Sequence, residues 1–584
     1  MKMSLRVSRI ALVLLMSAVI TSISFGQDYV GVETCQPCHT TALRTFPGFS
    51  SWQNTLHAKI HLPPDATTMK GNYAQTVSMG ASYGNATVTF RVDGANYYVQ
   101  LNPTTGSQVE YQVVYTYGGG WKQRYLVKIE SSYYITPVQW NLKGYLDNST
   151  GDWVTYNPQN WFTSTGILKP IDNAFRKKSW DKNCAGCHVV PNSKVGTVAT
   201  NVVGTDTSWV YTWGNNGSDA NIIVGCESCH GPRTSIAGSG HVNNLQSLSY
   251  DRKLEVCGQC HFRGSSKNHA YEYPYDETTN VTYPVGEDLM NYITLVPGLW
   301  PDGKNSKQHH QQWQDYKQAK HYNSTIGITC VSCHDPHQVT AYPHQLKQDF
   351  YSLTPGTGCV SCHATKATET AGINNHTKHP QTISQCVNCH MTQNAVTAKS
   401  YDISNHSFIP IRPNATLNFS GSTNGMLNTC AVSCHRNGQG TRGPGSNFGI
   451  TDASLTNWAE ATDLALADTL WRYYQILYGV SGIQVANSNI PSNFSLGQNY
   501  PNPFNPATTI SFSVPQRSNV KVEIYSISGE LVNIILNDEL DAGNYNLTWD
   551  AKSVDGYDVS SGVYIYRMIA NQNVVMSKKM ALVR

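Results

Sequence analysis

All sixteen cysteines of this 584-residue chain occur in pairs, and a histidine follows the second cysteine of every pair. Seven pairs read Cys-x-x-Cys-His: Cys35/Cys38/His39, Cys184/Cys187/His188, Cys226/Cys229/His230, Cys257/Cys260/His261, Cys330/Cys333/His334, Cys359/Cys362/His363 and Cys386/Cys389/His390. The eighth, Cys430/Cys434/His435, has three residues between its cysteines. With 20 histidines in 584 residues, eight such coincidences have chance odds of about 10⁻¹². No other feature constrains the fold as strongly.

This spacing predicts covalent haem attachment at each pair. Two thiols a short loop apart reach the two vinyl groups of one haem, and the adjacent histidine then becomes a ligand of the iron. Zinc is the alternative, because Cys-x-x-Cys pairs also build tetrahedral zinc sites. A zinc site would require two pairs to combine and would leave the histidine unexplained. The sequence therefore predicts eight haem c groups bound by the sixteen cysteines and eight histidines. In the eighth motif, we expect the extra residue to bulge out.

Each iron then takes a second axial ligand or remains open. Twelve histidines are left for this role after the eight of the motifs are set aside: His57, His61, His241, His269, His309, His310, His321, His337, His344, His376, His379 and His406. That number exceeds the eight ligands required, and methionine is a weaker candidate. The sequence does not assign individual histidines to individual irons.

The N-terminus predicts an exported protein. Lys2, Arg6 and Arg9 precede an apolar stretch at residues 10–20 that is too short to span a bilayer, and small residues near 24–26 offer a cleavage site. The sequence therefore predicts a signal peptide at residues 1–26, with a membrane anchor as the alternative. No later stretch of about twenty apolar residues occurs. The net charge of +3, without long runs of one sign, does not favour a nucleic-acid partner.

Residues 27–436 are predicted to form one multihaem domain. Residues 184–435 place seven motifs in 252 residues, or about 36 per motif, which is too few for a core made of protein alone. We therefore expect short helices and loops wrapped around stacked haems. Between the first two motifs, alternating runs at residues 86–92, 97–101, 111–115 and 125–129 predict a small antiparallel β insert at about 70–145.

The C-terminal part changes character twice. Residues 437–487 are predicted to be a linker followed by an amphipathic helix at 451–478, where Leu455, Trp458 and Leu466 share the helical spacing of the apolar residues. Residues 488–584 are predicted to be an Ig-like β-sandwich, because strand-like runs at 508–514, 520–525, 545–549 and 563–567 alternate with turns.

The C-terminal module resembles the type A sorting domain of the type IX secretion system. The similarity rests on residues 499–506 (Asn-Tyr-Pro-Asn-Pro-Phe-Asn-Pro), 524–529 (Ile-Tyr-Ser-Ile-Ser-Gly), 562–567 (Gly-Val-Tyr-Ile-Tyr-Arg) and the terminal residues 578–584. The resemblance implies export across the outer membrane to the cell surface or the medium, with the secretion machinery as a partner. An ordinary Ig-like adhesion module is the alternative.

Residues 29–436 resemble the multihaem cytochrome c-552/c-554 family. The similarity rests on residues 30–35 with Trp52 and His57, and on the segments 225–232, 256–261, 327–337, 386–391 and 405–408. The resemblance implies second axial ligands at His57, His241, His321, His337, His376 or His379, and His406. The Cys-x-x-x-Cys-His motif departs from the family pattern.

These features favour an electron-transfer protein over an enzyme. If all eight irons have two histidine ligands, none can bind a substrate, and the chain can only pass electrons between redox proteins or extracellular acceptors. The alternative is an octahaem oxidoreductase that acts on small nitrogen or sulfur compounds at one open haem. A periplasmic location and a homo-oligomer also stay open. No catalytic residue is predicted.

Overall fold

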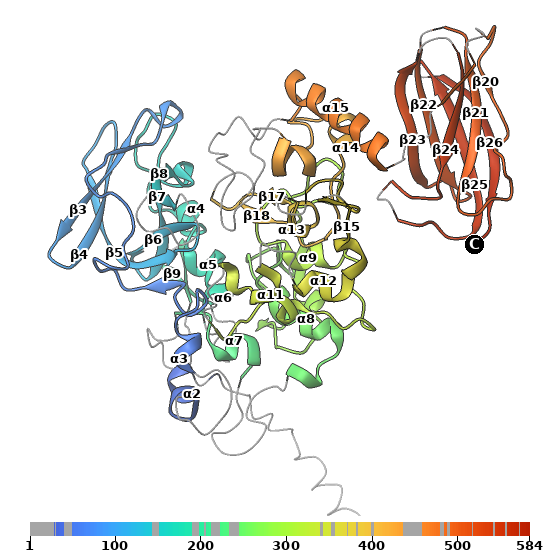
Figure 1. Ribbon diagram of the computed structural model, residues 1–584. Coiled ribbons are helices and arrows are strands. Elements are labelled where there is room, and N and C mark those ends of the chain that lie inside the picture. The colour runs from blue at the N-terminus through green and yellow to red at the C-terminus, as the bar shows by residue number, and fades with distance from the viewer. Residues whose placement is uncertain are drawn as a thin grey trace, which may run out of the picture.

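The computed structural model of the protein describes residues 29, 31–39, 49–142, 151–189, 198–203, 206–211, 222–232, 245–338, 343–351, 357–370, 372–380, 384–398, 402–435, 458–478, 484–487, 491–516, 518–540, 543–554, 557–571 and 573–584 (Figure 1). Several predictions lie outside the described residues: the signal peptide, the linker at 437–457 and His241. Within the part described, no helix is long and apolar enough to cross a membrane.

The β insert is a continuous antiparallel sheet. Its strands are β1 (His61–Leu62), β2 (Val77–Ser78), β3 (Thr87–Asp93), β4 (Asn96–Asn102), β5 (Val109–Gly118), β6 (Lys122–Ile129), β7 (Ser132–Leu142) and β8 (Gly151–Thr155). They pair in sequence order from β2 to β8, and β1 pairs with β5. The four predicted runs lie in β3 to β6, whereas the alternation did not indicate β7, which is buried along nearly its whole length. A strand buried on both faces loses the period-two pattern.

The sheet curls until its two ends meet. Phe90 of β3 stacks on Trp153 of β8 with ring centroids 4.3 Å apart, and Trp153 donates its indole N–H to the carbonyl oxygen of Asn72 at 2.8 Å. The apolar side chains that fill the curl include Val88, Val99 and Val138, all essentially inaccessible to solvent. The insert is therefore a nearly closed β unit with an apolar core of its own.

The central region is made of short helices joined by loops (Figure 1). The helices are α2 (Val32–His39), α3 (Phe49–Trp52), α4 (Asn173–Arg176), α5 (Trp180–Asn183), α6 (Ala185–His188), α7 (Cys226–His230), α8 (Tyr250–Gly258), α9 (Gln312–Tyr316), α10 (Cys330–Cys333), α11 (Gln348–Tyr351), α12 (Thr357–His363), α13 (Cys386–His390) and α14 (Pro413–Asn418). Most have only one or two turns, so tertiary contacts must hold them in place.

Two-stranded ribbons fill the spaces between these helices. They are β9 (Val198–Val203) with β10 (Asp206–Tyr211), β11 (Gly264–Ser266) with β14 (Ile293–Leu295), β12 (Tyr275–Asp276) with β13 (Val281–Thr282), β15 (Glu369–Thr370) with β16 (Ile373–Asn374), and β17 (Gln393–Ala395) with β18 (Ile403–Ser404). Counted with the two β domains, strands exceed helices in the described part of this chain. The sequence indicated short helices here but did not indicate the ribbons. Except for β9 and β10, the ribbon strands have only two or three residues, too few for a readable period.

The predicted helix at 451–478 is shorter than expected. Helix α15 begins at Ala461 and ends at Tyr478, while residues 451–457 lie outside the described residues. Trp458 precedes the helix: its backbone N–H donates to the carbonyl oxygen of Asn424 at 2.7 Å. Its side chain is 1% exposed in a cluster with Met426 and Leu427. Burial of this indole in the central region explains why the apolar spacing continued past the true start of the helix.

The C-terminal domain is a two-layer β-sandwich, which Figure 1 shows beyond α15. Its strands are β19 (Gln484–Asn487), β20 (Ser495–Leu496), β21 (Thr508–Val514), β22 (Ser518–Ser526), β23 (Leu531–Leu540), β24 (Gly543–Trp549), β25 (Gly562–Ala570) and β26 (Asn573–Leu582). One sheet has the order β19-β24-β21-β20 and the other β23-β22-β25-β26. Trp549, Phe512 and Tyr566 are buried between the layers. The four predicted strands are β21, β22, β24 and β25.

Candidate haem-binding site

The seven Cys-x-x-Cys-His motifs each occupy about one helical turn. They lie in α2, α6, α7, α10, α12 and α13, and at the C-terminal end of α8, where the backbone N–H of His261 donates to the carbonyl oxygen of Cys257 at 3.0 Å. Positions i, i+3 and i+4 of a helical turn project from the same face. Local backbone structure alone therefore aims both thiols and the imidazole of each motif toward one side.

The eighth motif forms a wider turn. Residues Ala431–His435 are a π-helical turn, which takes about one residue more than an α turn. The side chains of Ala431, Val432 and Ser433 are buried, so the extra residue does not bulge out toward solvent as expected. The wider turn instead absorbs it. This spacing keeps Cys430, Cys434 and His435 on a common face, as in the other motifs.

Hydrogen bonds from buried residues hold this π turn. The side-chain oxygen of Asn428 accepts the backbone N–H of Ala431 at 2.9 Å, and its amide nitrogen donates to the Thr416 hydroxyl at 2.9 Å. The Ser433 hydroxyl donates to the carbonyl oxygen of Asn388, inside the seventh motif, at 2.6 Å. The seventh and eighth motifs are therefore fixed directly to one another.

Seven motif histidines each face a second histidine from a different segment. The pairs, with the distance between ring centroids, are His188–His61 (6.1 Å), His230–His337 (6.1 Å), His261–His57 (6.4 Å), His334–His406 (6.3 Å), His363–His321 (6.0 Å), His390–His376 (6.0 Å) and His435–His379 (6.1 Å). A metal-bound imidazole nitrogen lies about 2 Å from the metal, so two imidazoles on opposite sides of one ion have ring centres about 6 Å apart. The spacing of the pairs fits one iron between each.

The orientation of several of these rings is fixed by backbone carbonyl groups. The Nδ1 atoms of His334 and His390 contact the carbonyl oxygens of His344 and Phe408 at 2.8 and 2.9 Å. On the opposite side, Nδ1 of His61 contacts the carbonyl oxygen of Ile222 at 3.0 Å. The same contact in His379 and His406 goes to a residue two positions earlier. A hydrogen bond at Nδ1 leaves Nε2 as the ligating atom.

Burial keeps these imidazoles neutral. Desolvation lowers the pKa of His57 and of His406 to about 4, with neighbouring histidines contributing in the same direction. Desolvation and the nearby Arg124 guanidinium lower the pKa of His188 to about 3. Neutral imidazole is the form that ligates a metal. These histidines are therefore in a ligating state across the neutral pH range.

The motifs form a connected series in space. Sγ of Cys187 and Sγ of Cys260 each lie 3.6 Å from a backbone carbonyl oxygen of the other's motif, which joins motifs two and four. A hydrogen bond to the Cys35 thiol raises the pKa of the Cys226 thiol, so motifs one and three are in contact. The first cysteines of motifs four and five are hydrogen-bonded to one another in the same way, and so are the first cysteines of motifs six and seven.

The first motif is described only in part. The backbone of Cys38 belongs to α2, but its side chain lies outside the described residues, so haem attachment at Cys38 stays a prediction. His39 ends the same helix and is exposed. The position of this motif is therefore defined by Cys35, which contacts Cys226. No disulfide joins any of the fifteen cysteines whose side chains are described.

Two of the described motif cysteines, Cys362 and Cys386, have exposed side chains, whereas Cys359, the first cysteine of the sixth motif, is partly buried. At Cys362 the exposure extends to its neighbours in α12, since Ser361 and His363 are exposed as well. The roles of Cys362 and Cys386 in holding haem stay predictions.

Pairs of histidines close in sequence connect neighbouring motifs as well. His57 and His61 face the fourth and second motifs, and His376 and His379 face the seventh and eighth. Residues three or four apart are neighbours on one face of a chain turn. Each such pair therefore places two of the candidate sites close together.

The predicted second ligands divide as follows. His57, His321, His337, His376, His379 and His406 each face a motif histidine, and both members of the alternative His376 or His379 do so. The resemblance did not indicate His61; its spacing of four residues from His57 was the available signal. His241 lies outside the described residues.

Four further histidines make other contacts. His344 stacks on Trp121 at 4.6 Å, and His269 hydrogen-bonds the Ser265 hydroxyl at 2.7 Å. His309 and His310 contact one another with centroids 4.3 Å apart. Among the described residues, no three His, Cys, Asp or Glu side chains gather as ligands of one metal ion would.

The His61–His188 pair differs from the other six. The Tyr117 hydroxyl lies 3.0 Å from Nε2 of His188, and the Tyr117 ring stacks on His61 at 5.1 Å. Desolvation raises the pKa of Tyr117 well above its ordinary value, so the hydroxyl stays protonated. At this motif, a third side chain therefore reaches the nitrogen that the other motifs leave for the metal.

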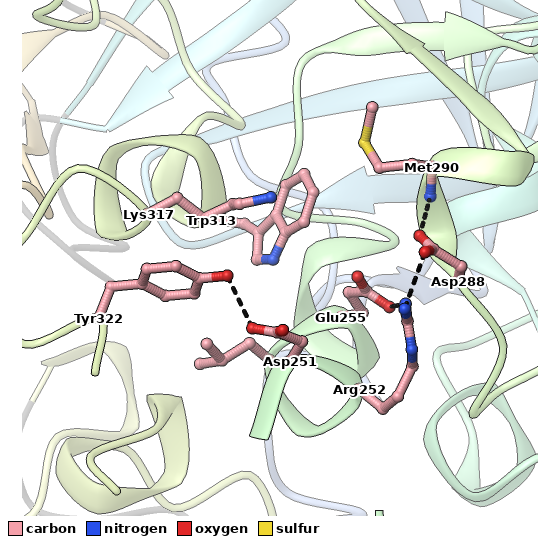
Figure 2. Close-up of a pocket in the computed structure, with 9 residues that line it drawn as sticks. Asp251, Arg252, Glu255, Asp288, Met290, Trp313, Lys317 and Tyr322 are labelled. Atoms are coloured by element: carbon pink, nitrogen blue, oxygen red, sulfur yellow. Dashed lines mark hydrogen bonds and ion pairs between the residues drawn. The ribbon is translucent and has the colours of Figure 1, made fainter. Parts of the chain in front are cut away.

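A small cavity of about 150 Å³ lies beside α8, the helix that leads into the fourth motif (Figure 2). Arg252 links Glu255 and Asp288, while the Tyr322 hydroxyl donates to Asp251 at 2.7 Å. Trp313 lies so close to Gly258 that a Cβ there would contact the indole at 2.8 Å. Arg252, Glu255 and Asp288 of this cavity are thus paired with one another, and Lys317 lies over the Trp313 ring.

Comparison with known proteins identifies the C-terminal part. Residues 498–582 match the secretion system C-terminal sorting domain. The dimeric latent PorU of Porphyromonas gingivalis is 28% identical over 16% of this chain and 10% of its own, with a TM-score of 0.15. PorZ, a surface component of the type IX secretion system of the same organism, is 22% identical over 17% of this chain and 13% of its own, with a TM-score of 0.12.

Over a longer stretch, the chain is similar to the outer cell wall cytochrome OcwA. The identity is 19%, with 77% of this chain and 99% of the other covered, and the TM-score is 0.42. That superposition is loose. The specific family match is confined to the last domain, so residues 498–582 of this protein form a secretion system C-terminal sorting domain.

Proposed function

We propose that this chain is a secreted octahaem c-type cytochrome that carries electrons along a series of closely spaced haems. The observation that supports this most strongly is the set of seven histidine pairs with ring centroids 6.0–6.4 Å apart. Each pair joins a motif histidine to one outside its own motif, at the separation required for two axial ligands. The sixteen cysteines would hold eight haems, and the paired histidines would ligate their irons.

The bound haems would supply one-electron exchange between ferric and ferrous iron. The chain's own contribution is to position them. Contacts between motifs one and three, two and four, four and five, six and seven, and seven and eight support short separations between neighbouring sites. In each of the seven histidine pairs, imidazoles would occupy both axial positions of the iron. A substrate could therefore not bind to those irons. The protein would then accept and release electrons without further chemistry.

The sorting domain supports a place for this activity outside the outer membrane. Redox partner proteins or extracellular acceptors would exchange electrons with the haems, and the type IX secretion machinery would be the export partner. A haem chain at the cell surface connects reductants inside the envelope with acceptors that cannot enter it. The exposed side chains of Cys362 and Cys386 suit the sixth and seventh motifs as the places where such an acceptor would approach a haem edge.

The Tyr117 contact favours a second candidate function at one position. A hydroxyl 3.0 Å from Nε2 of His188 would compete with His61 for space beside that iron. An octahaem oxidoreductase acting on small nitrogen or sulfur compounds would use such a site, since a displaceable ligand leaves room for substrate.

Mass and spin state test the proposal together. The protein is purified from its own host, and its intact mass is expected to exceed that of the mature chain by eight haems. The EPR spectrum of the oxidised protein is expected to contain low-spin signals of two classes, because three pairs have interplanar angles of 9–25° and three have angles of 79–85°. Absence of covalent haem would overturn the proposal; a high-spin signal that Tyr117→Phe alters would select the enzyme.

A further inference from the structure

We propose that the cavity beside α8 is a binding site for a small organic ammonium compound that also carries a hydroxyl group. Glu255 and Asp251 accept the N–H groups of this ligand, and the Trp313 indole donates to its oxygen. The inference goes beyond electron transfer, because it concerns a part of the central region that none of the histidine pairs uses.

The Glu255 carboxylate is the most enclosed charged group of the cavity. The residue is 4% exposed, and its Oε2 atom accepts from the Arg252 guanidinium and from the backbone N–H of Leu289. Among the described residues, no group donates to the other oxygen, Oε1. Figure 2 shows this oxygen on the side of the cavity where Trp313 lies. A buried acceptor without a donor is costly, so a ligand N–H is stabilised at this position.

The Trp313 indole supplies the complementary donor. The residue is 3% exposed, its backbone N–H donates to the carbonyl oxygen of His261 at 3.1 Å, and its ring lies against Gly258. These contacts with the fourth motif fix the position of the indole. Within the part of the chain that the structure describes, its Nε1 atom has no acceptor, and Figure 2 shows that atom on the cavity side. A buried indole N–H usually has an acceptor, which a ligand oxygen provides here.

The charges that line the cavity favour a cation. The Arg252 guanidinium is shared between Glu255 and Asp288, so one positive charge serves two carboxylates. Asp251 is a third carboxylate, and its Oδ1 atom accepts only a neutral tyrosine hydroxyl. With Lys317 included, three acidic and two basic side chains surround the cavity. An ammonium group therefore completes the balance of charge.

A bare metal ion does not fit the same lining. Among the described residues, the acidic side chains do not converge as the ligands of one metal ion would, and an indole N–H cannot ligate a cation. The Lys317 ammonium lies 4.6 Å from the centre of the Trp313 ring and covers that face of the indole. The ligand therefore meets Trp313 at its N–H edge, which requires a hydrogen-bond acceptor.

The cavity also limits the size of the ligand. Its volume of about 150 Å³ equals that of an engineered protein cavity that holds one benzene molecule, so it accommodates about six non-hydrogen atoms. Asp251 is exposed and Met290 is 38% exposed, so the lining reaches solvent on their side. Ethanolamine has the required ammonium and hydroxyl groups within this size.

The test is isothermal titration calorimetry of the haem-loaded full chain with three compounds. Ethanolamine carries both groups, propylamine lacks the hydroxyl, and propanol lacks the ammonium. Because ligands of this size bind weakly, the titration extends into the millimolar range. Saturable binding of ethanolamine is expected, with weaker binding of propylamine and none of propanol. Glu255→Gln is expected to weaken the binding of ethanolamine at least about tenfold, the factor that a lost charge-assisted hydrogen bond corresponds to.

A second variant separates binding from folding. Trp313→Phe keeps an aromatic ring against Gly258 but removes the N–H group, so it is expected to lower the affinity for ethanolamine to that for propylamine and to leave propylamine unaffected. Where Glu255→Gln does not fold, this variant decides. Asp93→Asn removes a carboxylate of the β insert whose side chain is 69% exposed, and it should bind ethanolamine as wild type does.

Failure of the wild-type chain to bind ethanolamine, or equal binding of ethanolamine and propanol, would overturn this site. Neither result affects the proposed function, which instead fails if the protein from its own host carries no covalent haem.

Discussion

At the scale of single residues, histidines divide into three groups by what fixes them. The motif histidines are placed by their own helical turn. Their opposite partners are placed by distant segments and oriented by carbonyl groups, as His61 is by Ile222. His309 and His310 belong to neither group and instead contact one another, with ring centroids 4.3 Å apart. The residue type alone does not separate these groups, because all their members are histidines.

Removal of one opposite histidine is expected to change one haem only. His376→Ala leaves His390 with one open coordination position, since the two rings of this pair lie 6.0 Å apart in the wild-type chain. The haem stays attached through Cys386 and Cys389, so the haem content is unchanged while one high-spin ferric signal appears in the EPR spectrum. His269→Ala, at an exposed histidine bonded to Ser265, is the matched control and should keep the wild-type spectrum. An unchanged spectrum of His376→Ala would contradict the assignment.

A second residue-scale prediction concerns Asp181. Desolvation raises the pKa of this buried carboxyl from 3.8 to about 7 although it accepts the backbone N–H groups of Tyr133 and Tyr211. Because the folded-state pKa is the higher one, this contribution to stability is complete below about pH 4 and is lost as pH rises to about 7. The loss amounts to at most about 4 kcal/mol.

The measurement for Asp181 is the free energy of unfolding between pH 4 and 8. Asp181→Asn is expected to be less stable overall, because one of two buried N–H groups loses its acceptor, but its stability should vary less with pH than that of wild type. Equal slopes for the two proteins would show that the carboxyl ionises normally.

At the scale of elements, one-turn helices replace the long helices of most globular domains. A helix of one turn is not stable by itself, so each motif depends on bonds to its neighbours. The eighth motif shows this most clearly, because Asn428 and Ser433 hold the π turn to α14 and to the seventh motif.

Asn428→Ala is expected to weaken the eighth site in particular. The substitution leaves the Ala431 N–H group and the Thr416 hydroxyl buried without their partners, which costs about 1–3 kcal/mol. A misplaced turn should also lower attachment at Cys430 and Cys434, seen as a fraction of protein with seven haems in the intact mass. Asn418→Ala, at the exposed end of α14, should retain eight. Full occupancy of the eighth site in Asn428→Ala would argue against a role of this side chain in forming the turn.

At the scale of the whole molecule, two β units flank a central region. The nearly closed sheet and the sandwich each have a compact apolar core. The central region instead contains several smaller apolar clusters, and its motifs contact them. The sorting domain therefore has the packing of an independent module, and all the motif cysteines and all the histidines of the chain precede it.

Deletion of residues 488–584 is expected to separate export from haem binding. The shortened chain should carry as many haems as wild type and should remain inside the outer membrane, because the sorting signal is gone. Cell fractionation with haem staining measures both quantities. Leu531→Ser changes a side chain that is 42% exposed on the sandwich and lies outside the segments of the sorting-domain resemblance, and it is the control for normal export. Surface display of the deleted chain at the wild-type level would contradict this prediction.

The sequence predicted several elements of the fold directly. Runs with period two at residues 86–92 and 508–514 lie in β3 and β21, because half-buried strands alternate apolar and polar side chains. The sequence did not indicate β7, where burial removes that alternation, and it placed the start of α15 too early, because Trp458 is apolar for packing in the central region. The two-residue strands β1 and β2 carry no readable period at all.

The candidate site likewise has a part that the sequence predicted and a part that it did not. The sequence by itself determined the motifs, because two cysteines and a histidine within one turn meet through local backbone geometry. Only the tertiary structure decided which histidine faces which motif, and which motif, like that of Cys362, lies open to solvent. His57 and His261, or His230 and His337, are brought within about 6 Å across more than one hundred residues, and such a separation depends on how the whole central region packs rather than on any local pattern.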